Sequence, residues 1–332
     1  MDNRRIMIEE VAPDFYKIEV PLQDTMLKYV NSYIVRGRPR SLIIDAGDYD
    51  DDSVHTMKDA LKQLGIDLRE TDFFITHYHV DHIGVALRLK SEGTAIYINE
   101  IETRMVDKLK SGAFLSDIEN FFRISGFPEI DPEKIVPPFV SNVYKSDDRF
   151  PFRFLKEGDT IKAGNYRFVC LETPGHSGGH MCLYEEEKRL LLSGDHLLSD
   201  ITPSIQGGNS MQNPLKGYLS SLEKINALDV GLVLPGHRSI FKNHKERIRQ
   251  LKDHHNQRTK GILSILKEGS MSTYRVASQM TWNVDCDSWD SFPILHSFFA
   301  TEEAYAHLVY LEDKGEIVRE MEGQVAVYSL SR

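Results

Sequence analysis

The chain has 332 residues, of which 41% are hydrophobic and 27% charged, and a formal net charge of −10 at pH 7. This composition is typical of a globular protein, and the length predicts one large domain plus a small one. The acidic balance disfavours a protein whose main partner is a nucleic acid, and no apolar run is long enough to span a membrane. The N-terminus lacks a secretory signal and the three cysteines lack C-x-x-C spacing, so we expect a cytoplasmic protein with neither a disulfide framework nor a thiolate metal site.

The first 76 residues predict a sheet of short strands with one covering helix. Apolar and β-branched residues typical of strands occur in YKIEVPL, NSYIV, SLIIDAG and FFIT (residues 16–22, 31–35, 41–47 and 73–76). Residues 52–64 have the pattern of a helix that ends at Gly65. Further along, IGVALRLK (83–90) also has helical periodicity.

The sequence pattern from residue 100 to about 150 differs from that of its surroundings, because it predicts helices followed by an irregular segment. TRMVDKLKSG and SDIENFFRISG look helical, and the proline-containing FPEIDPEKIVPPF follows them. We interpret this stretch as a helical insertion that lies over the functional site. Its phenylalanines either line a pocket or fasten the insertion to the body, and both roles stay open for Phe114, Phe121, Phe122 and Phe127.

The second half of the chain predicts more strands, then helices, then a small unit. Strand patterns recur from about 152 to 194, and helices at about 214–227 and 243–267 flank the strand DVGLVLPG. From Ser272 onward, a helix–helix–hairpin pattern resembles a winged helix. We therefore predict two domains, a catalytic domain over 1–268 and a winged-helix-like domain over 269–332.

The segment ITHYHVDHIG (75–84) carries the strongest chemical signal. It places His77, His79, Asp81 and His82 within six positions, and burying three imidazoles and a carboxylate is costly unless a partner satisfies them. Their spacing fits no single helical face, unlike that of H-E-x-x-H, so it is typical of a turn whose side chains converge on a cation.

Three later segments repeat one design, in which an apolar strand is followed by a glycine and then by a side chain that can bind a metal. FVCLETPGH ends in His176, LLLSGD ends in Asp195 and GLVLPGH ends in His237. Strand ends of one sheet can place such side chains at one rim, and the glycine lets the backbone turn sharply there. Seven ligands are too many for one tetrahedral ion but suit two.

These motifs resemble the metallo-β-lactamase superfamily from about residue 30 to residue 240. The matching features are HxHxDH, the histidine of TPGH, the aspartate of GD and the histidine of PGH. The resemblance implies an α/β fold, the αββα four-layer sandwich, to which the small C-terminal domain is added. It also implies two metal sites with these ligands: His77, His79 and His176 for the first metal; Asp81, His82 and His237 for the second; and Asp195 as the bridge.

Three further residues match less clearly. Asp45, in LIIDAG, corresponds to an aspartate that orients a ligand histidine in the superfamily, although an Asx-type turn before Gly47 would also explain it. His180 and His196 lie close to predicted ligands in the sequence, and we leave both out of the ligand set.

The resemblance implies a dinuclear, metal-dependent hydrolase in which a hydroxide bridging two divalent ions attacks the substrate. Asp81 and Asp195 would position this hydroxide and are the predicted catalytic residues. Zinc is the first choice for histidine and aspartate ligands, although iron or manganese also fits them.

The filled HxHxDH motif is shared by glyoxalase II, by ribonuclease Z-like nucleases and by a lactamase-β-like group with a C-terminal winged helix, which this chain resembles best. Residues 242–260 carry seven Lys/Arg against two Asp/Glu, so this helix either attracts an anionic substrate or is a solvated face. Residues 271–332 carry four Lys/Arg against ten Asp/Glu, the wrong balance for gripping nucleic acid.

We therefore expect hydrolysis of a small anionic thioester or ester. An endoribonuclease acting on RNA is the first alternative, and a metal-binding ligand sensor with little turnover is the second. We interpret the C-terminal unit as a packing, lid or dimerisation module, so a homodimer is compatible with the sequence.

Overall fold

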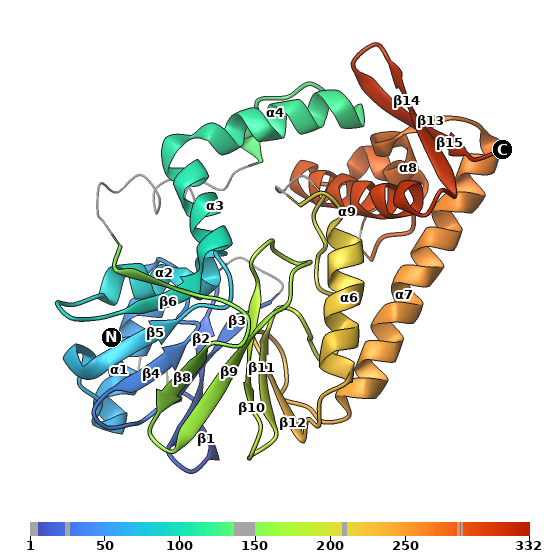
Figure 1. The fold of residues 1–332 in the computed structure, drawn as a ribbon. Coiled ribbons are helices and arrows are strands. Elements are labelled where there is room, and N and C mark those ends of the chain that lie inside the picture. The colour runs from blue at the N-terminus through green and yellow to red at the C-terminus, as the bar shows by residue number, and fades with distance from the viewer. Residues whose placement is uncertain (1–5, 24–26, 136–149, 208–210, 284–285, 287) are drawn as a thin grey trace.

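Two sheets packed face to face form the centre of the molecule (Figure 1). The computed structural model describes residues 6–23, 27–135, 150–207, 211–283, 286 and 288–332. Within these ranges the first sheet has seven strands in the order β1-β2-β3-β4-β5-β6-β7. The second has five strands in the order β12-β11-β10-β9-β8, and a third, three-stranded sheet has the order β13-β15-β14.

The bounds of the elements are as follows. The first sheet consists of β1 (Ile8–Ala12), β2 (Phe15–Pro21), β3 (Tyr29–Val35), β4 (Ser41–Ile44), β5 (Thr71–Phe74), β6 (Ile96–Asn99) and β7 (Phe152–Leu155). The second sheet consists of β8 (Thr160–Ala163), β9 (Tyr166–Glu172), β10 (Met181–Glu185), β11 (Leu190–Gly194) and β12 (Leu232–Pro235). The small sheet consists of β13 (Met271–Ser272), β14 (Ile317–Glu322) and β15 (Val325–Leu330). The helices are α1 (Asp51–Leu64), α2 (Val80–Leu89), α3 (Glu100–Ser111), α4 (Ala113–Ser125), α6 (Pro214–Asn226), α7 (His244–Ile265), α8 (Thr273–Gln279) and α9 (Ile294–Asp313).

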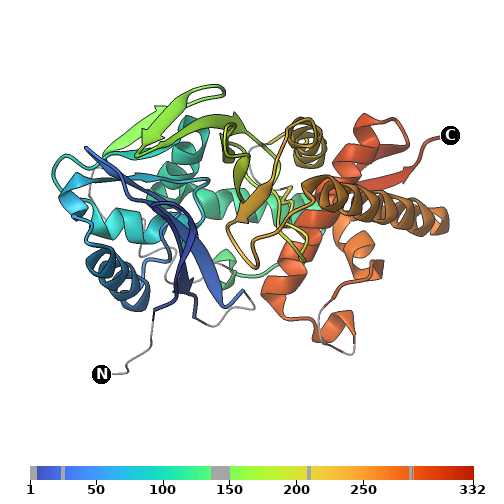
Figure 2. The ribbon, with the colours of Figure 1, turned by 90° about the horizontal axis from the view of Figure 1, so that it is seen from below.

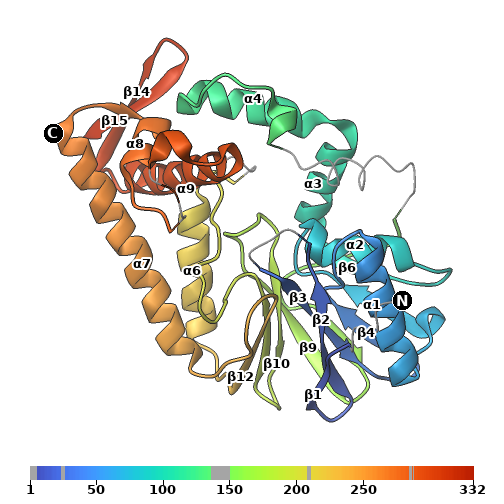
Figure 3. The same cartoon turned by 180° about the vertical axis from the view of Figure 1, so that it is seen from behind.

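Alternation of side chains along the strands builds the layers, because successive residues of a strand point to opposite faces. Tyr33 and Leu42 pack in the core between the two sheets, whereas Ile34 and Ile43 pack under α1 and α2. A third core joins the outer face of the second sheet to α6 and α7 (Figures 2 and 3). The order helix, sheet, sheet, helix confirms the predicted αββα sandwich. Within the described ranges, no helix is both long and apolar enough to cross a membrane.

The first two helices begin earlier in the chain than predicted, and the second includes part of the histidine-rich segment. Helix α1 begins one residue before its predicted start, and Gly65 ends it in the left-handed conformation (φ 66°). Helix α2 begins at Val80 rather than at the predicted residue 83, with His79 as its N-cap. The histidine-rich segment is therefore a turn followed by a helix rather than a turn alone. Asp81 lies in the first helical turn, where a negative charge is favoured by the helix dipole.

The C-terminal elements follow the predicted helix–helix–hairpin order, β13, α8, α9, β14 and β15. They share a core to which the end of α7 contributes Ile262, while Leu251, earlier in the same helix, packs in the core of the second sheet. Helix α7 thus belongs to both cores. The boundary between the two domains, 1–268 and 269–332, stays a prediction.

Two helices of the predicted insertion, α3 and α4, lead away from the sandwich and reach the C-terminal elements (Figures 1 and 3). Residues 136–149 of the same insertion lie outside the described residues. Phe122 and Phe127 are stacked with their ring centroids 4.8 Å apart, and both meet the ring of Phe298 on α9 edge-on. These two phenylalanines fasten the insertion, but to the C-terminal unit rather than to the sheets.

The cysteines have no visible chemical role. All three are free, and Cys170 and Cys182 are buried. Burial raises the pKa of both thiols to about 12, so they remain protonated and inert near neutral pH.

We expect Phe122→Ala to lower the free energy of unfolding by about 3–5 kcal/mol, because it removes a buried ring and leaves a cavity in this aromatic cluster. Urea denaturation followed by tryptophan fluorescence would measure the change. Phe154→Ala is the matched control, since Phe154 is 54% exposed and its loss should change stability by less than about 0.5 kcal/mol. Equal effects of the two substitutions would contradict the packing role of Phe122.

Candidate metal centre

Seven polar side chains meet at one rim of the sandwich, where they follow strands β5, β9, β11 and β12. They are the seven predicted ligands, His77, His79, Asp81, His82, His176, Asp195 and His237. Five of them are buried, and His79 and Asp81 are half-buried. The structure brings all seven into three groups that share members, and the donor atoms of each group lie within 4.8 Å of one another.

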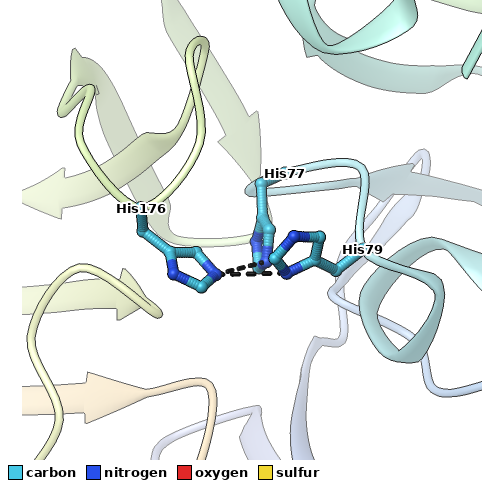
Figure 4. Close-up of side chains that lie close together, drawn as sticks. All are labelled: His77, His79 and His176. Carbon is cyan, nitrogen blue, oxygen red and sulfur yellow. Dashed lines mark hydrogen bonds between the residues drawn. The ribbon is translucent and has the colours of Figure 1, made fainter. Parts of the chain in front are cut away.

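The first group consists of three histidines whose ring nitrogens converge (Figure 4). His176 Nε2 lies 3.2 Å from His77 Nε2 and 3.1 Å from His79 Nδ1. Burial, together with the neighbouring imidazoles, lowers the pKa of all three rings, that of His79 to about 3. The three imidazoles are thus held in the neutral form that a metal ion requires.

The second ring nitrogen of most of these histidines has a fixed partner. His176 Nδ1 donates to the carbonyl of Ser204 (2.8 Å), and His237 Nδ1 donates to the carbonyl of Tyr29 (3.0 Å). His77 Nδ1 lies 3.0 Å from the Thr76 hydroxyl. A proton fixed on Nδ1 leaves the lone pair on Nε2, and the Nε2 atoms of these rings face the centre.

The second group consists of Asp81, His82 and His237. His237 Nε2 lies 3.2 Å from Asp81 Oδ2, and His82 Nε2 lies 3.7 Å from the same oxygen. Asp195 reaches both groups, because its Oδ2 atom lies 3.6 Å from His176 Nε2 and 3.5 Å from His237 Nε2. This is the arrangement that a bridging carboxylate would need.

The electrostatics of the second group differ from those of the first. Burial lowers the pKa of His82, but the carboxylates of Asp45 and Asp81 outweigh it and hold that pKa well above its usual range. Burial likewise raises the pKa of Asp195, but the imidazoles of His237 and His82 outweigh it and hold that pKa well below its usual range. The carboxylate is thus kept ionised at the point where cations would be bound.

Buried polar atoms that lack a hydrogen-bond partner indicate that the donor set fits metal ions. Among the described residues, His82 Nε2, His237 Nε2 and Asp195 Oδ1 are buried polar atoms without a hydrogen-bond partner. Each such atom costs about 1–3 kcal/mol if nothing satisfies it. A Cβ on Gly236 would lie 2.6 Å from Asp195 Oδ1, so only glycine leaves this carboxylate its room. Divalent cations are the partners that would satisfy imidazole and carboxylate donors together.

Asp45 lies behind the ligands and contacts one of them. Its Oδ2 atom accepts a hydrogen bond from His82 Nδ1 (2.8 Å), and its Oδ1 atom accepts one from the backbone N–H of Thr76 (2.9 Å). The structure therefore favours the orienting role over the Asx-turn explanation.

The two histidines that were left out of the ligand set lie near the centre, and neither belongs to any of its three groups. His180 Nδ1 lies 2.7 Å from the Thr173 hydroxyl, and its Nε2 atom accepts the backbone N–H of Asp195 (3.2 Å). Both of its nitrogens are engaged, so His180 supports the backbone of a ligand. The ring of His196 packs against Tyr218, with the centroids 5.2 Å apart.

One residue of this region was not predicted from the sequence. Glu102 of α3 is 1% exposed, and its carboxylate accepts hydrogen bonds from the backbone of Tyr78 (2.8 Å) and from the hydroxyl of Ser177 (2.9 Å). Its Oε1 atom also accepts the N–H of Gly179. Glu102 thus joins the segment that carries His77 and His79 to the segment that carries His176. Nothing in its spacing distinguishes it from Glu100, which is exposed on the same helix.

We expect Glu102→Gln to lower metal affinity about 10–100-fold, because an amide group cannot accept hydrogen bonds from donors on both of its terminal atoms. Titration with zinc against a competing chelator would measure the affinity, and Glu100→Gln is the matched control. Unchanged affinity in Glu102→Gln would show that the two segments hold their places without this carboxylate.

Comparisons with known proteins agree with the fold. Residues 26–237 match the metallo-beta-lactamase superfamily. The probable metallo-hydrolase YqjP of Bacillus subtilis is 25% identical over 315 residues, which cover 89% of this chain and 92% of that protein. The acyl-coenzyme A thioesterase MBLAC2 of Gallus gallus is 28% identical over 64% of this chain and 73% of its own. The crystal structure of the metallo-beta-lactamase family protein TTHA1429 from Thermus thermophilus superposes with a TM-score of 0.79 and 26% identity, covering 97% of this chain and 100% of that one. The chain belongs to the metallo-beta-lactamase superfamily and is a metal-dependent hydrolase.

Proposed function

We propose that this protein uses two divalent metal ions to hydrolyse a small anionic thioester or ester. The observation that carries the proposal is the complete set of seven donors in three groups that share members, with Asp195 Oδ2 within 3.6 Å of His176 and of His237. His77, His79 and His176 would hold the first ion. Asp81, His82 and His237 would hold the second, and Asp195 would bridge the two.

When bound, two divalent ions supply Lewis acidity and lower the pKa of a water molecule between them toward neutrality. The residues of the chain keep the donors in position for this chemistry. Asp45 fixes the ring of His82, and the carbonyls of Ser204 and Tyr29 fix the rings of His176 and His237. Asp81 is half-buried and therefore reaches the accessible side of the centre. Asp81 and Asp195 would accept hydrogen bonds from the attacking water and so aim it at the substrate carbonyl.

Zinc is the metal that we propose first, because imidazole and carboxylate ligands suit it. Iron or manganese would fit the same ligands. Metal analysis of protein purified without added metal would identify the ion and give the stoichiometry, for which we expect two ions per chain.

A thioester is favoured over RNA by two observations. The first is the relative from Gallus gallus, which is named as an acyl-coenzyme A thioesterase. The second is that most basic residues of α7 already interact with other groups of the protein. Arg247 donates to the carbonyls of Leu198 and Ile201, and Arg258 pairs with Glu303. Arg249 and Lys252 pair with acidic neighbours as well. Most of the positive charge of this helix is therefore already engaged within the protein.

We expect the metal-loaded protein to hydrolyse acyl-glutathione or acyl-CoA thioesters and to leave single-stranded RNA intact. Release of free thiol would be followed with a thiol reagent, and RNA would be followed by gel electrophoresis. RNA cleavage without thioester hydrolysis would favour the endoribonuclease. Tight ligand binding in metal-free protein, without turnover of either class, would favour the sensor.

We expect Asp195→Asn to lower kcat/KM by about 10³-fold, because the amide can neither bridge two cations nor accept hydrogen bonds from water through both atoms. Metal content should fall below two ions per chain, while the circular dichroism of the sheets stays unchanged. Asp229→Asn is the matched control, since Asp229 is an exposed residue paired with Arg189. Near-normal hydrolysis by Asp195→Asn with two metals bound would overturn the bridging assignment.

A further inference from the structure

A cavity of about 120 Å³ lies between the insertion and the C-terminal unit. Helices α3 and α4 form two of its walls through Met105 and Phe114, and α9 forms a third wall through Phe298 and Phe299. Tyr78 and Gln206 complete the side that faces the sandwich. The cavity therefore combines elements of the sandwich, the insertion and the C-terminal unit.

None of the seven donor residues lines the cavity, but two of the lining residues connect it to the metal centre. Tyr78 lies between His77 and His79 in the sequence, and its ring centroid is 4.7 Å from that of His79. Gln206 comes two residues after Ser204, whose carbonyl holds the ring of His176. His79 is thus linked to the cavity wall by a ring contact, and His77 and His176 are linked to it through neighbours in the chain, so a molecule attacked at the metal centre could extend into the cavity.

The lining of the cavity is apolar on most sides and carries no cation in the described part of the chain. Met105, Leu109 and Phe114 are half-buried, and Phe299 is 38% exposed, so the protein leaves these apolar surfaces open. The charged groups of the lining, Asp117 and Glu302, are acidic. An anionic group is therefore disfavoured inside, whereas an uncharged hydrocarbon group would bury apolar surface on both partners.

The volume limits the size of the occupant. A protein cavity of about 150 Å³ holds a molecule as large as benzene. A cavity of about 120 Å³ would by the same measure take a hydrocarbon group of roughly four to six carbon atoms. A long fatty acyl chain would extend beyond the cavity, so its additional methylene groups would gain no burial there.

We propose that this cavity binds the acyl group of the substrate and selects acyl groups of about four to six carbon atoms, while the anionic carrier stays outside it. The proposal rests on the proposed thioester or ester hydrolase activity and names the acyl part of its substrate. It assigns Met105 of α3 and Phe299 of α9 as specificity-determining residues. The C-terminal unit accordingly contributes to substrate binding rather than to packing alone.

The first test compares kcat/KM over a series of acetyl, butanoyl, hexanoyl, octanoyl and dodecanoyl thioesters on the carrier that is hydrolysed, glutathione or CoA. In the wild-type protein we expect about a fourfold rise for each added methylene up to hexanoyl, and no rise beyond it. Met105→Trp fills the cavity, so kcat/KM should fall at least about tenfold for hexanoyl but less than about threefold for acetyl. Met321→Trp, on the exposed strand β14, is the matched control and should leave the profile unchanged.

A second variant acts in the opposite direction. Phe299→Ala opens the cavity, so the preferred acyl group should become longer by two or more carbon atoms. Phe154→Ala removes a ring of similar exposure from β7 and should shift nothing. Parallel changes for all chain lengths in both cavity variants would overturn the proposal while leaving the hydrolase activity established.

A binding measurement separates this proposal from the proposed function. S-hexylglutathione and S-methylglutathione are thioethers without a carbonyl next to the sulfur, so the protein cannot hydrolyse them there. Isothermal titration should show tighter binding of the hexyl compound, and Met105→Trp should abolish the difference while Met321→Trp keeps it. This result without thioester turnover would support the cavity and contradict the hydrolase proposal. Equal binding of the two thioethers by the wild-type protein would overturn the cavity proposal.

Discussion

The attachment of the two sheets to each other at one rim is the constraint on which the metal centre depends. Each sheet supplies part of the donor set, so a shift of one sheet against the other would separate the donors. Backbone hydrogen bonds tie the rim together, from Asn31 N–H to the carbonyl of Gly236 (2.7 Å) and from Met181 N–H to the carbonyl of Thr76 (3.0 Å). Both bonds join the first sheet or its loops to the second. The apolar core below them prevents sliding, because its side chains interdigitate at close packing.

The arrangement of this rim lowers the stability of the fold, although it positions the donor groups. Buried imidazoles and carboxylates lose hydration, and several of their atoms find no hydrogen-bond partner among the described residues. The surrounding backbone is also unusual, since Asp45 (φ 50°) and Gly194 (φ 46°) adopt left-handed conformations beside the donors. A Cβ on Gly194 would lie 2.7 Å from His180 Nε2, the atom that accepts the backbone N–H of Asp195. Such costs are sustained where the rest of the fold over-determines the local geometry, which is what two packed sheets provide.

The sequence was sufficient to predict the sandwich and the side chains that the structure groups at one rim, but not what lies between distant segments. His77, His176 and His237 could be found because each follows an apolar strand in a short, recognisable motif. The start of α2 at Val80 was missed, since the ligand spacing obscured the helical periodicity of its first turn. Glu102 was missed for a different reason: its function depends on contacts with Tyr78 and Gly179, and no local pattern encodes a contact across 77 residues. The aromatic residues of the insertion could be identified from the sequence. Whether each one lines a pocket or packs the insertion in place could not be predicted, because this depends on where α9 lies.

The position of α9 also bears on how the proposed anionic substrate would be oriented at the metal centre. Its aromatic side chains, Phe298 and Phe299, meet the insertion, whereas its acidic residue Glu302 faces the cavity beside the metal centre. Because the described lining of this cavity contains no basic side chain, the cavity would favour the uncharged part of the proposed substrate over its anionic carrier. The cations would meanwhile attract the carrier from outside. This difference between the two sides of the scissile bond would therefore orient the substrate before any specific hydrogen bond forms, since electrostatic forces act over a longer range than contacts do.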